Sequence, residues 1–305
     1  MTPARESIPS GLAGERVDRI VAMITGASRA EAASLVAAGN VRVSGRVVTV
    51  RSARVAEGDV VEIDAPAAGV PTLVADPGVP VQVVYEDADV IVVDKPAGLV
   101  VHPGAGNRTG TLVQGLLARY PELEGVGDAA RPGIVHRLDK DTSGLLAVAR
   151  SPTAYESLVA QLAARTVERR YLALVWGHPD SARGLVDAPV GRSGRQPTRM
   201  AVSTRGREAR TRYEVVQTFA DPVEVALVQC SLETGRTHQV RVHLAAIGHP
   251  VVGDKAYGGS RQSLRVPRFF LHAAHLGFAH PRSGDGLSFD SALPSDLADV
   301  LAGLA

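Results

Sequence analysis

Residues 133–144 read Gly-Ile-Val-His-Arg-Leu-Asp-Lys-Asp-Thr-Ser-Gly, and an apolar run from Leu145 to Ala149 follows them. A short apolar run bounded by turn residues is typical of a buried strand. We therefore expect a dense polar cluster on a loop between two buried segments, which is how a rigid scaffold often presents a functional site. Taken alone, the stretch is also compatible with a surface turn whose Asp and Thr side chains cap a helix.

The composition limits the class of protein. The chain has 305 residues, of which 45% are hydrophobic, which allows one large domain or two unequal ones with a proper core. The formal net charge is +1, so a nucleic-acid surface must come from local clustering of charge. No stretch approaches the roughly 20 apolar residues of a membrane span, and no signal peptide is expected.

The single cysteine, Cys230, cannot form an intramolecular disulfide and is compatible with a reducing cytoplasm, the location that we expect. It ends a strand-like run and, at a period of two, shares a face with Val228 and Leu232. We therefore expect a buried structural thiol and not a nucleophile.

The N-terminal part is expected to consist of a mobile tail, residues 1–11, and a compact unit, residues 12–65. Apolar periodicity and turn signals predict two helices, a hairpin and a further strand, over residues 16–24, 28–38, 41–48 and 60–63. Residues 16–54 carry seven arginines and two acids, a net charge of +5. Such a surface is compatible with phosphate binding and equally with plain solvation.

Residues 66–79 are rich in Ala, Pro and Gly and are expected to link this unit to a domain over residues 80–305. The sequence predicts helices in that domain over 111–119 and 151–164. Strand-like or apolar segments are found at residues 81–85, 90–93, 171–176, 215–219, 223–232, 239–243 and 269–278. Because the strands follow one another without regular βαβ alternation, we predict an α+β fold with a mixed, mainly antiparallel central sheet.

Several kinds of site are disfavoured. There is no P-loop, no dinucleotide fingerprint and no Gly-x-Ser-x-Gly elbow, so we expect no cofactor. The histidines lack metal-site spacing, since His238 and His243 would lie on opposite faces of a strand. A kinase loop is excluded because Leu138 separates Arg137 from Asp139. A glycosidase would need two opposed carboxylates, and nothing in the sequence shows that Asp139 and Asp141 face one substrate.

Two arginine-bearing segments could serve a nucleophilic carboxylate or a polyanion. A buried Asp needs a nearby cation to stay ionised, and Arg236 is the candidate, although a phosphate contact or a surface ion pair would explain it as well. Residues 191–212 carry seven arginines and one acid, a net charge of +6. This suits a polyanionic substrate, but an isolated charge run is more often a solvated face.

Six segments together resemble the RluA-type pseudouridine synthases. The first is His136–Gly144, and the others follow in order along about residues 80–300: Asp94–Gly98 with His102-Pro103, Arg169–Val175, Gly235–Arg241, Gly248–Pro250 with Gly253-Asp254, and Leu271–Ala273. Residues 14–18 and 28–46 are similar to the small RNA-binding domain named after ribosomal protein S4. This combination is typical of the branch of the family that acts on large-subunit ribosomal RNA.

The resemblance implies an isomerase that detaches uracil from ribose, rotates it and re-attaches it through a ring carbon, without cofactor or metal. Asp139 would be the nucleophile and Arg236 its partner, Tyr171 would stack on the flipped base, and Arg137 would fill the vacated space. The implied partner is RNA, contacted by Arg16, Arg29, Arg42, Arg46, Arg192, Arg195 and Arg199.

Two alternatives stay open at this point: a non-catalytic ribosome-associated RNA-binding protein, and a synthase acting on transfer RNA. The first gives no reason for carboxylates around Asp139, because phosphate binding needs only cations. The N-terminal unit argues weakly against the second. The target uridine, the number of sites, the oligomeric state and whether Asp139 attacks the sugar or the base are equally open.

Overall fold

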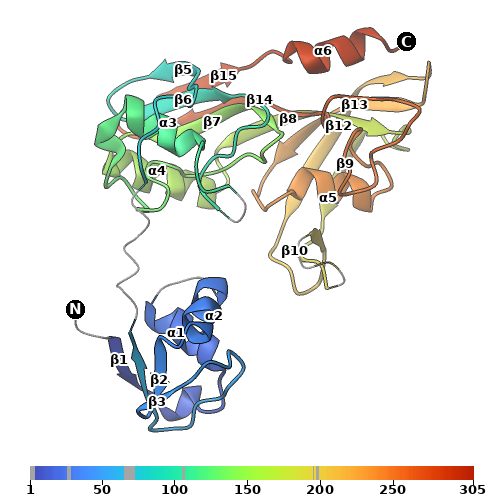
Figure 1. The fold of residues 1–305 in the computed structure, drawn as a ribbon. Coiled ribbons are helices and arrows are strands. Elements are labelled where there is room, and N and C mark those ends of the chain that lie inside the picture. The colour runs from blue at the N-terminus through green and yellow to red at the C-terminus, as the bar shows by residue number, and fades with distance from the viewer. Residues whose placement is uncertain (1–3, 26–28, 65–72, 105–106, 195, 197–198) are drawn as a thin grey trace. The chain divides into compact units, whose positions relative to one another are not determined.

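The computed structural model describes the chain except for residues 1–3, 26–28, 65–72, 105–106, 195 and 197–198 (Figure 1). Backbone contacts divide the chain into two units, Met1–Thr72 and Leu73–Ala305. Each unit has its own hydrophobic core and is considered by itself.

The expected linker, residues 66–79, is only partly a connection between the units. Residues 66–72 lie outside the described residues. The backbone N–H of Asp76 donates to the carbonyl of Gln114 at 2.9 Å, and Gln114 Nε2 donates to the carbonyl of Val74 at 3.2 Å. Residues 73–79 therefore belong to the larger unit.

The N-terminal unit combines two helices with a small antiparallel sheet in the order β1-β4-β2-β3. Its elements are β1 (Ala4–Ser7), a 3-10 turn (Ser10–Leu12), α1 (Val17–Thr25), α2 (Arg29–Ala37), β2 (Val41–Val43), β3 (Arg46–Val47) and β4 (Val60–Ile63). Val17, Ile20 and Val21 of α1 are spaced to share one helix face and are buried in its core. The predicted helices, hairpin and last strand are confirmed.

Strand β1 corrects the expectation of a mobile tail over residues 1–11. Ala4 lies opposite Ile63 and Ser7 opposite Val60, so β1 pairs antiparallel with β4. Residues 5–7 are exposed. Backbone pairing, and not burial of side chains, forms this strand, so it leaves no apolar alternation in the sequence.

The larger unit is built on a mixed sheet in the order β5-β6-β7-β14-β8-β13-β12-β9, with β15 also paired to β14. In this sheet β7 and β14 run parallel, and the other pairings of the described strands are antiparallel. The predicted fold class is therefore confirmed. The strands are β5 (Val83–Glu86), β6 (Val90–Lys95), β7 (Ser143–Ala149), β8 (Glu168–Trp176), β9 (Arg183–Asp187), β12 (Arg210–Phe219), β13 (Val225–Leu232), β14 (Leu271–Ala279), β15 (Gly286–Asp290) and a separate hairpin of β10 (Val190–Arg192) and β11 (Met200–Val202).

Both faces of the central strands are buried. Along β7, Leu146 and Val148 belong to one hydrophobic cluster, and Leu145 and Ala147 belong to another. Residues of α3 and α5 join the first cluster, and residues of α4 join the second. This explains why the strand reads as a continuous apolar run. The helices are α3 (Leu112–Arg119), α4 (Pro152–Ala163), α5 (Gln239–Ala246) and α6 (Ser295–Ala302), with a 3-10 turn at Pro121–Leu123.

Helix α5 corrects the prediction of a strand over residues 239–243. Val240 and Leu244, one turn apart, pack in the main core, whereas Val242 packs beside Val190 in a separate cluster. A helix buried on several sides shows no single apolar stripe, and Gln-Val-Arg-Val-His alternates over too few residues to distinguish the two periods.

Candidate active site

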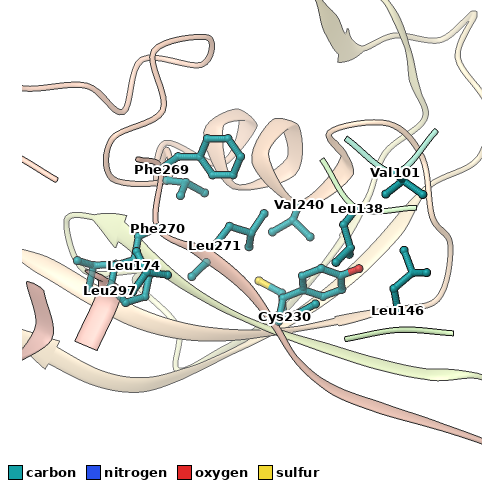
Figure 2. Packing of buried hydrophobic residues seen from close by; sticks show 14 of the residues in the cluster. Val101, Leu138, Leu146, Leu174, Cys230, Val240, Phe269, Phe270, Leu271 and Leu297 are labelled. Carbon is teal, nitrogen blue, oxygen red and sulfur yellow. The ribbon is translucent and has the colours of Figure 1, made fainter. Parts of the chain in front are cut away.

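The loop before β7 alternates between solvent and core. Arg137 is exposed, Leu138 is 3% exposed, and the side chain of Asp139 is 16% exposed. Figure 2 shows Leu138 among the side chains of Val101, Val240 and Leu146. Leu138 therefore anchors the loop and holds its two charged neighbours at different depths.

Gly144 fixes the other end of the loop, where β7 meets β14. Its φ is +112°, and a Cβ at this position would lie 2.2 Å from the carbonyl oxygen of Ala273. Only glycine tolerates both the backbone conformation and the close approach of the two strands. The geometry of the polar loop is thus tied directly to the sheet.

Asp139 is held by Arg241, from the first turns of α5. Arg241 Nη1 donates to Asp139 Oδ2 at 3.0 Å. Its Nε and Nη2 donate to the two oxygens of Asp254, at 2.6 and 3.0 Å. Because the planar guanidinium is already fixed by a bidentate pair, the remaining N–H is aimed at Asp139 in one orientation.

Aromatic rings enclose the same guanidinium. Arg241 Cζ lies 4.3 Å from the centre of the Phe269 ring and 5.0 Å from that of Tyr257. Burial disfavours the charge, but the hydrogen bonds to Asp254 and the charge of Asp139 outweigh it and raise the pKa of Arg241. The cation beside Asp139 is therefore permanent.

The expectation that Arg236 pairs with Asp139 is wrong. Arg236 Nε donates to the carbonyl of Glu208 at 2.9 Å, and its side chain lines the cavity in front of Asp139. The error follows from the misread secondary structure, since the helical turn after His238 brings Arg241 inward and leaves Arg236 on the preceding turn. Recognising 239–246 as a helix could have identified Arg241.

His238 stands immediately before α5 in a left-handed conformation, with φ of +57°. Its Nδ1 is hydrogen-bonded to the hydroxyl of Tyr257 at 2.8 Å, and its Nε2 lies 4.0 Å from Asp139 Oδ1. A non-glycine residue in this region is uncommon and is often found at functional sites. By contrast, His243 is hydrogen-bonded inside the protein to Thr211 and the carbonyl of Ala188, so its role is structural.

Two cavities of about 620 Å³ each have Asp139 in their walls. They also share His102, Arg137, His238 and Arg241. This volume is within the usual range for small-ligand sites. Asp139 is therefore accessible from two adjoining spaces.

Tyr171 and Arg137 both line the first cavity. Tyr171 is 7% exposed, and burial raises the pKa of its hydroxyl to about 12, so the phenol stays neutral. Arg137 is exposed at the opening and also lines the second cavity. The structure thus brings Asp139, Tyr171 and Arg137 to one site.

Lys95 was not among the predicted site residues, although the Asp-Lys-Pro turn that contains it was noted. It is completely buried at the end of β6. Its Nζ donates to the carbonyls of Pro96, Leu99 and Lys140, at 2.8, 2.8 and 3.0 Å. Burial lowers its pKa to about 7. Lys95 ties the end of β6 to the residue that follows Asp139.

The described arginines among those predicted to contact RNA lie at the surface of both units. In the N-terminal unit Arg29, Arg42 and Arg46 are exposed, while Arg16 is half-buried and pairs with Asp18 at 2.7 Å. Arg192 and Arg199 lie exposed on the β10–β11 hairpin or beside it. Arg195 lies outside the described residues.

Neither a cluster of metal ligands nor a membrane-spanning helix is found among the described residues. In the described part of the chain, no three His, Cys, Asp or Glu side chains come together as metal ligands would. None of the described helices is both long enough and apolar enough to cross a bilayer.

Family models match both units of the chain. The model for RNA pseudouridylate synthase matches residues 89–246, just over half of the chain and including the whole polar loop. The S4 domain model matches residues 15–61.

Similar proteins span nearly the whole sequence. Ribosomal large subunit pseudouridine synthase D of Zymomonas mobilis is 43% identical, over 97% of this chain and 96% of its own. The protein of the same name from Xanthomonas campestris is 41% identical, over 97% and 91%. Among solved structures, Human RNA Pseudouridylate Synthase Domain Containing 1 has a TM-score of 0.58 and 30% identity, over 75% of this chain and 91% of its own. With the site geometry, these matches show that the chain is an RNA pseudouridine isomerase, a member of the RNA pseudouridylate synthase family with an N-terminal S4 domain.

Proposed function

We propose that this enzyme converts uridines of large-subunit ribosomal RNA to pseudouridine, with Asp139 as the nucleophile. The observation that carries the proposal is a carboxylate held by Arg241 at 3.0 Å in the wall of two cavities. The relatives that cover nearly the whole chain bear large-subunit names, which supports this substrate class. We propose a cytoplasmic location as well, because the single cysteine and a ribosomal RNA substrate both suit it.

In this proposal the side chains of Arg137, Tyr171 and Arg241 each have a distinct role in the reaction at Asp139. A uridine in folded RNA must first leave its stack, which costs a few kcal/mol. Arg137 is exposed beside the cavity, which supports a role in filling the vacated space. Tyr171 offers an aromatic face for the flipped base. Arg241 orients Asp139 and compensates its charge while that carboxylate acts.

The exposed arginines provide the attraction to RNA. The S4 unit and the β10–β11 hairpin present Arg29, Arg46, Arg192 and Arg199 toward solvent. Contacts of this kind position the RNA backbone and carry little sequence information. Their contribution should weaken steeply as the salt concentration rises.

Mapping pseudouridines in cells with and without this protein tests the substrate. Large-subunit sites that disappear support the proposal, whereas loss confined to transfer RNA would favour the transfer-RNA alternative. In vitro, Asp139→Asn should abolish product formation on RNA that the wild type modifies, with RNA affinity nearly unchanged. Asp180→Asn, at an exposed residue, is the matched control and should retain full turnover. Normal turnover by Asp139→Asn would exclude its role as nucleophile.

A further inference from the structure

Arg169 is a buried arginine of the same cavity, and none of the described carboxylates pairs with its charge. It lies on β8 two residues before Tyr171, so both side chains project from one face of the strand. Arg169 is 7% exposed, and its Nε has no hydrogen-bond partner. Nη2 reaches the carbonyl of Leu232 only at 3.4 Å. Among the groups that shift its pKa there is likewise no carboxylate within the described part of the chain.

The next residue shows the contrast. Arg170 points to the other face of β8, where its guanidinium lies 2.5 Å from Glu168 and its side chain is 43% exposed. Two adjacent arginines on one strand therefore differ in burial and pairing. Arg170 forms an ordinary surface ion pair with Glu168, whereas no such pair is found for the buried Arg169 among the described residues.

Leaving a guanidinium buried and unpaired is costly. Burial is the main cause that lowers the pKa of Arg169. The guanidinium packs against Gly235, where a Cβ would lie 2.8 Å from Nη1. A cation kept in a cleft under these conditions is a candidate for binding an anion.

Depth distinguishes this arginine from others around the cavity. Arg165 and Arg207 line the same cavity but are exposed, and Arg236 is half-buried. These outer side chains suit RNA phosphates, which stay hydrated at the surface. Arg169 lies deeper, beside Tyr171, where the flipped base rather than the backbone is expected.

The isomerisation creates an anion at this place. When Asp139 attacks C1′, the bond from N1 to C1′ breaks, its electron pair passes to the uracil ring, and O2 and O4 share the negative charge. After the ring turns, C5 bonds to C1′ as the bond from Asp139 to C1′ breaks. C5 then releases its proton while N1 takes up a proton, so atoms and charge balance. Between these steps the detached uracil is an anion, and a buried cation beside it would stabilise its negative charge.

We infer that Arg169 is a catalytic residue that donates hydrogen bonds from its guanidinium to O2 or O4 of the detached uracil. The inference rests on the proposed function, because it requires a flipped uridine beside Tyr171. The interaction strengthens as charge develops, so it lowers the barrier more than it aids binding.

The test compares Arg169→Met and Arg169→Lys with the control Arg170→Met, on RNA that the wild type modifies. Single-turnover rate at saturating enzyme, RNA Kd and its salt dependence are measured for each. We expect Arg169→Met to slow turnover about 100-fold, as loss of one oxyanion donor does, with Kd and its salt dependence unchanged. Arg169→Lys should recover part of the rate because it keeps the charge without the planar fork, and Arg170→Met should match the wild type.

Three outcomes would overturn the role of Arg169. The first is a wild-type rate in Arg169→Met. The second is weaker RNA binding with a salt slope reduced by about one and an unchanged saturated rate, which indicates a phosphate contact. The third is a lowered Tm with no rescue by lysine, which indicates a structural role. If the wild-type chain itself forms no pseudouridine in ribosomal or transfer RNA, the proposed function fails instead.

Discussion

At the scale of single residues, Arg241 binds two carboxylates at once, those of Asp254 and Asp139. It pairs with Asp254 through two hydrogen bonds and with Asp139 through a third. The neighbouring Arg236 belongs to the same motif, but its guanidinium donates to the carbonyl of Glu208 and, among the described residues, forms no hydrogen bond to Asp139. Substituting each of these two arginines, five residues apart, therefore compares loss of the contact to Asp139 with loss of a contact elsewhere.

Arg241→Met should destabilise the fold by about 3–5 kcal/mol, because two carboxylates lose their buried counter-ion. It should also slow turnover by about 100-fold, since Asp139 is no longer held in place. Arg236→Met should leave stability unchanged and mainly weaken RNA binding. Urea unfolding and turnover assays check both variants, and equal effects of the two substitutions on stability would contradict this assignment.

Cys230 provides a pH-dependence prediction. Burial raises the pKa of its thiol to about 12, whereas an unfolded cysteine titrates near about 8.5. Above about pH 8.5 the unfolded chain loses a proton that the native chain keeps, so stability falls with rising pH, by at most about 1.4 kcal/mol per unit. Cys230→Ala should remove this part of the slope between pH 8.5 and 10. Identical slopes in the two proteins would mean that the thiol ionises in the folded state.

At the scale of elements, the parallel pairing of β7 with β14 fixes the position of the C-terminal end of the polar loop, residues 133–144. Gly144→Ala should cost at least about 2 kcal/mol, because the new methyl group meets the carbonyl of Ala273 and the backbone φ is positive. Gly284→Ala is the control, since Gly284 also has a positive φ (+79°) but no atom within 4 Å of the added Cβ. Equal stability losses would show that backbone strain alone matters at Gly144.

At the scale of the whole molecule, the boundary between units predicts where the chain can be cut. Residues 73–305 should fold alone with a Tm close to that of the full chain, because Val74 and Asp76 remain bound to Gln114. A shorter chain, residues 80–305, should melt lower. Thermal unfolding compares the two, and equal melting temperatures would show that residues 73–79 add nothing to stability.

Removing residues 1–72 should also weaken RNA binding by at least about tenfold at 0.1 M salt and flatten its salt dependence, since exposed arginines are lost. Product formation should persist on RNA supplied at high concentration. An unchanged RNA affinity would mean that the S4 unit does not contact the RNA used.

The amino-acid sequence alone was sufficient for features that repeat locally or that depend on residue type. The spacing of Val17, Ile20 and Val21 identified a helix, and the apolar run after Gly144 identified a buried strand. Asp139 was identified through the resemblance of residues 136–144 to the RluA-type signature, and the carboxylates of this loop argued against a purely RNA-binding protein. These signals need no knowledge of distant neighbours.

Only the tertiary structure decided features that depend on residues far apart in sequence. Which arginine reaches Asp139 depends on α5, whose burial on several sides hides its period, and on Asp254, which orients Arg241. Strand β1 exists because β4 supplies hydrogen bonds. The sequence does not show that the buried Nε of Arg169 lacks a hydrogen-bond partner, because this depends on which distant segments fold around it. Sequence patterns record local periodicity and chemistry, whereas a charge's partners are fixed by how the folded chain brings distant segments together.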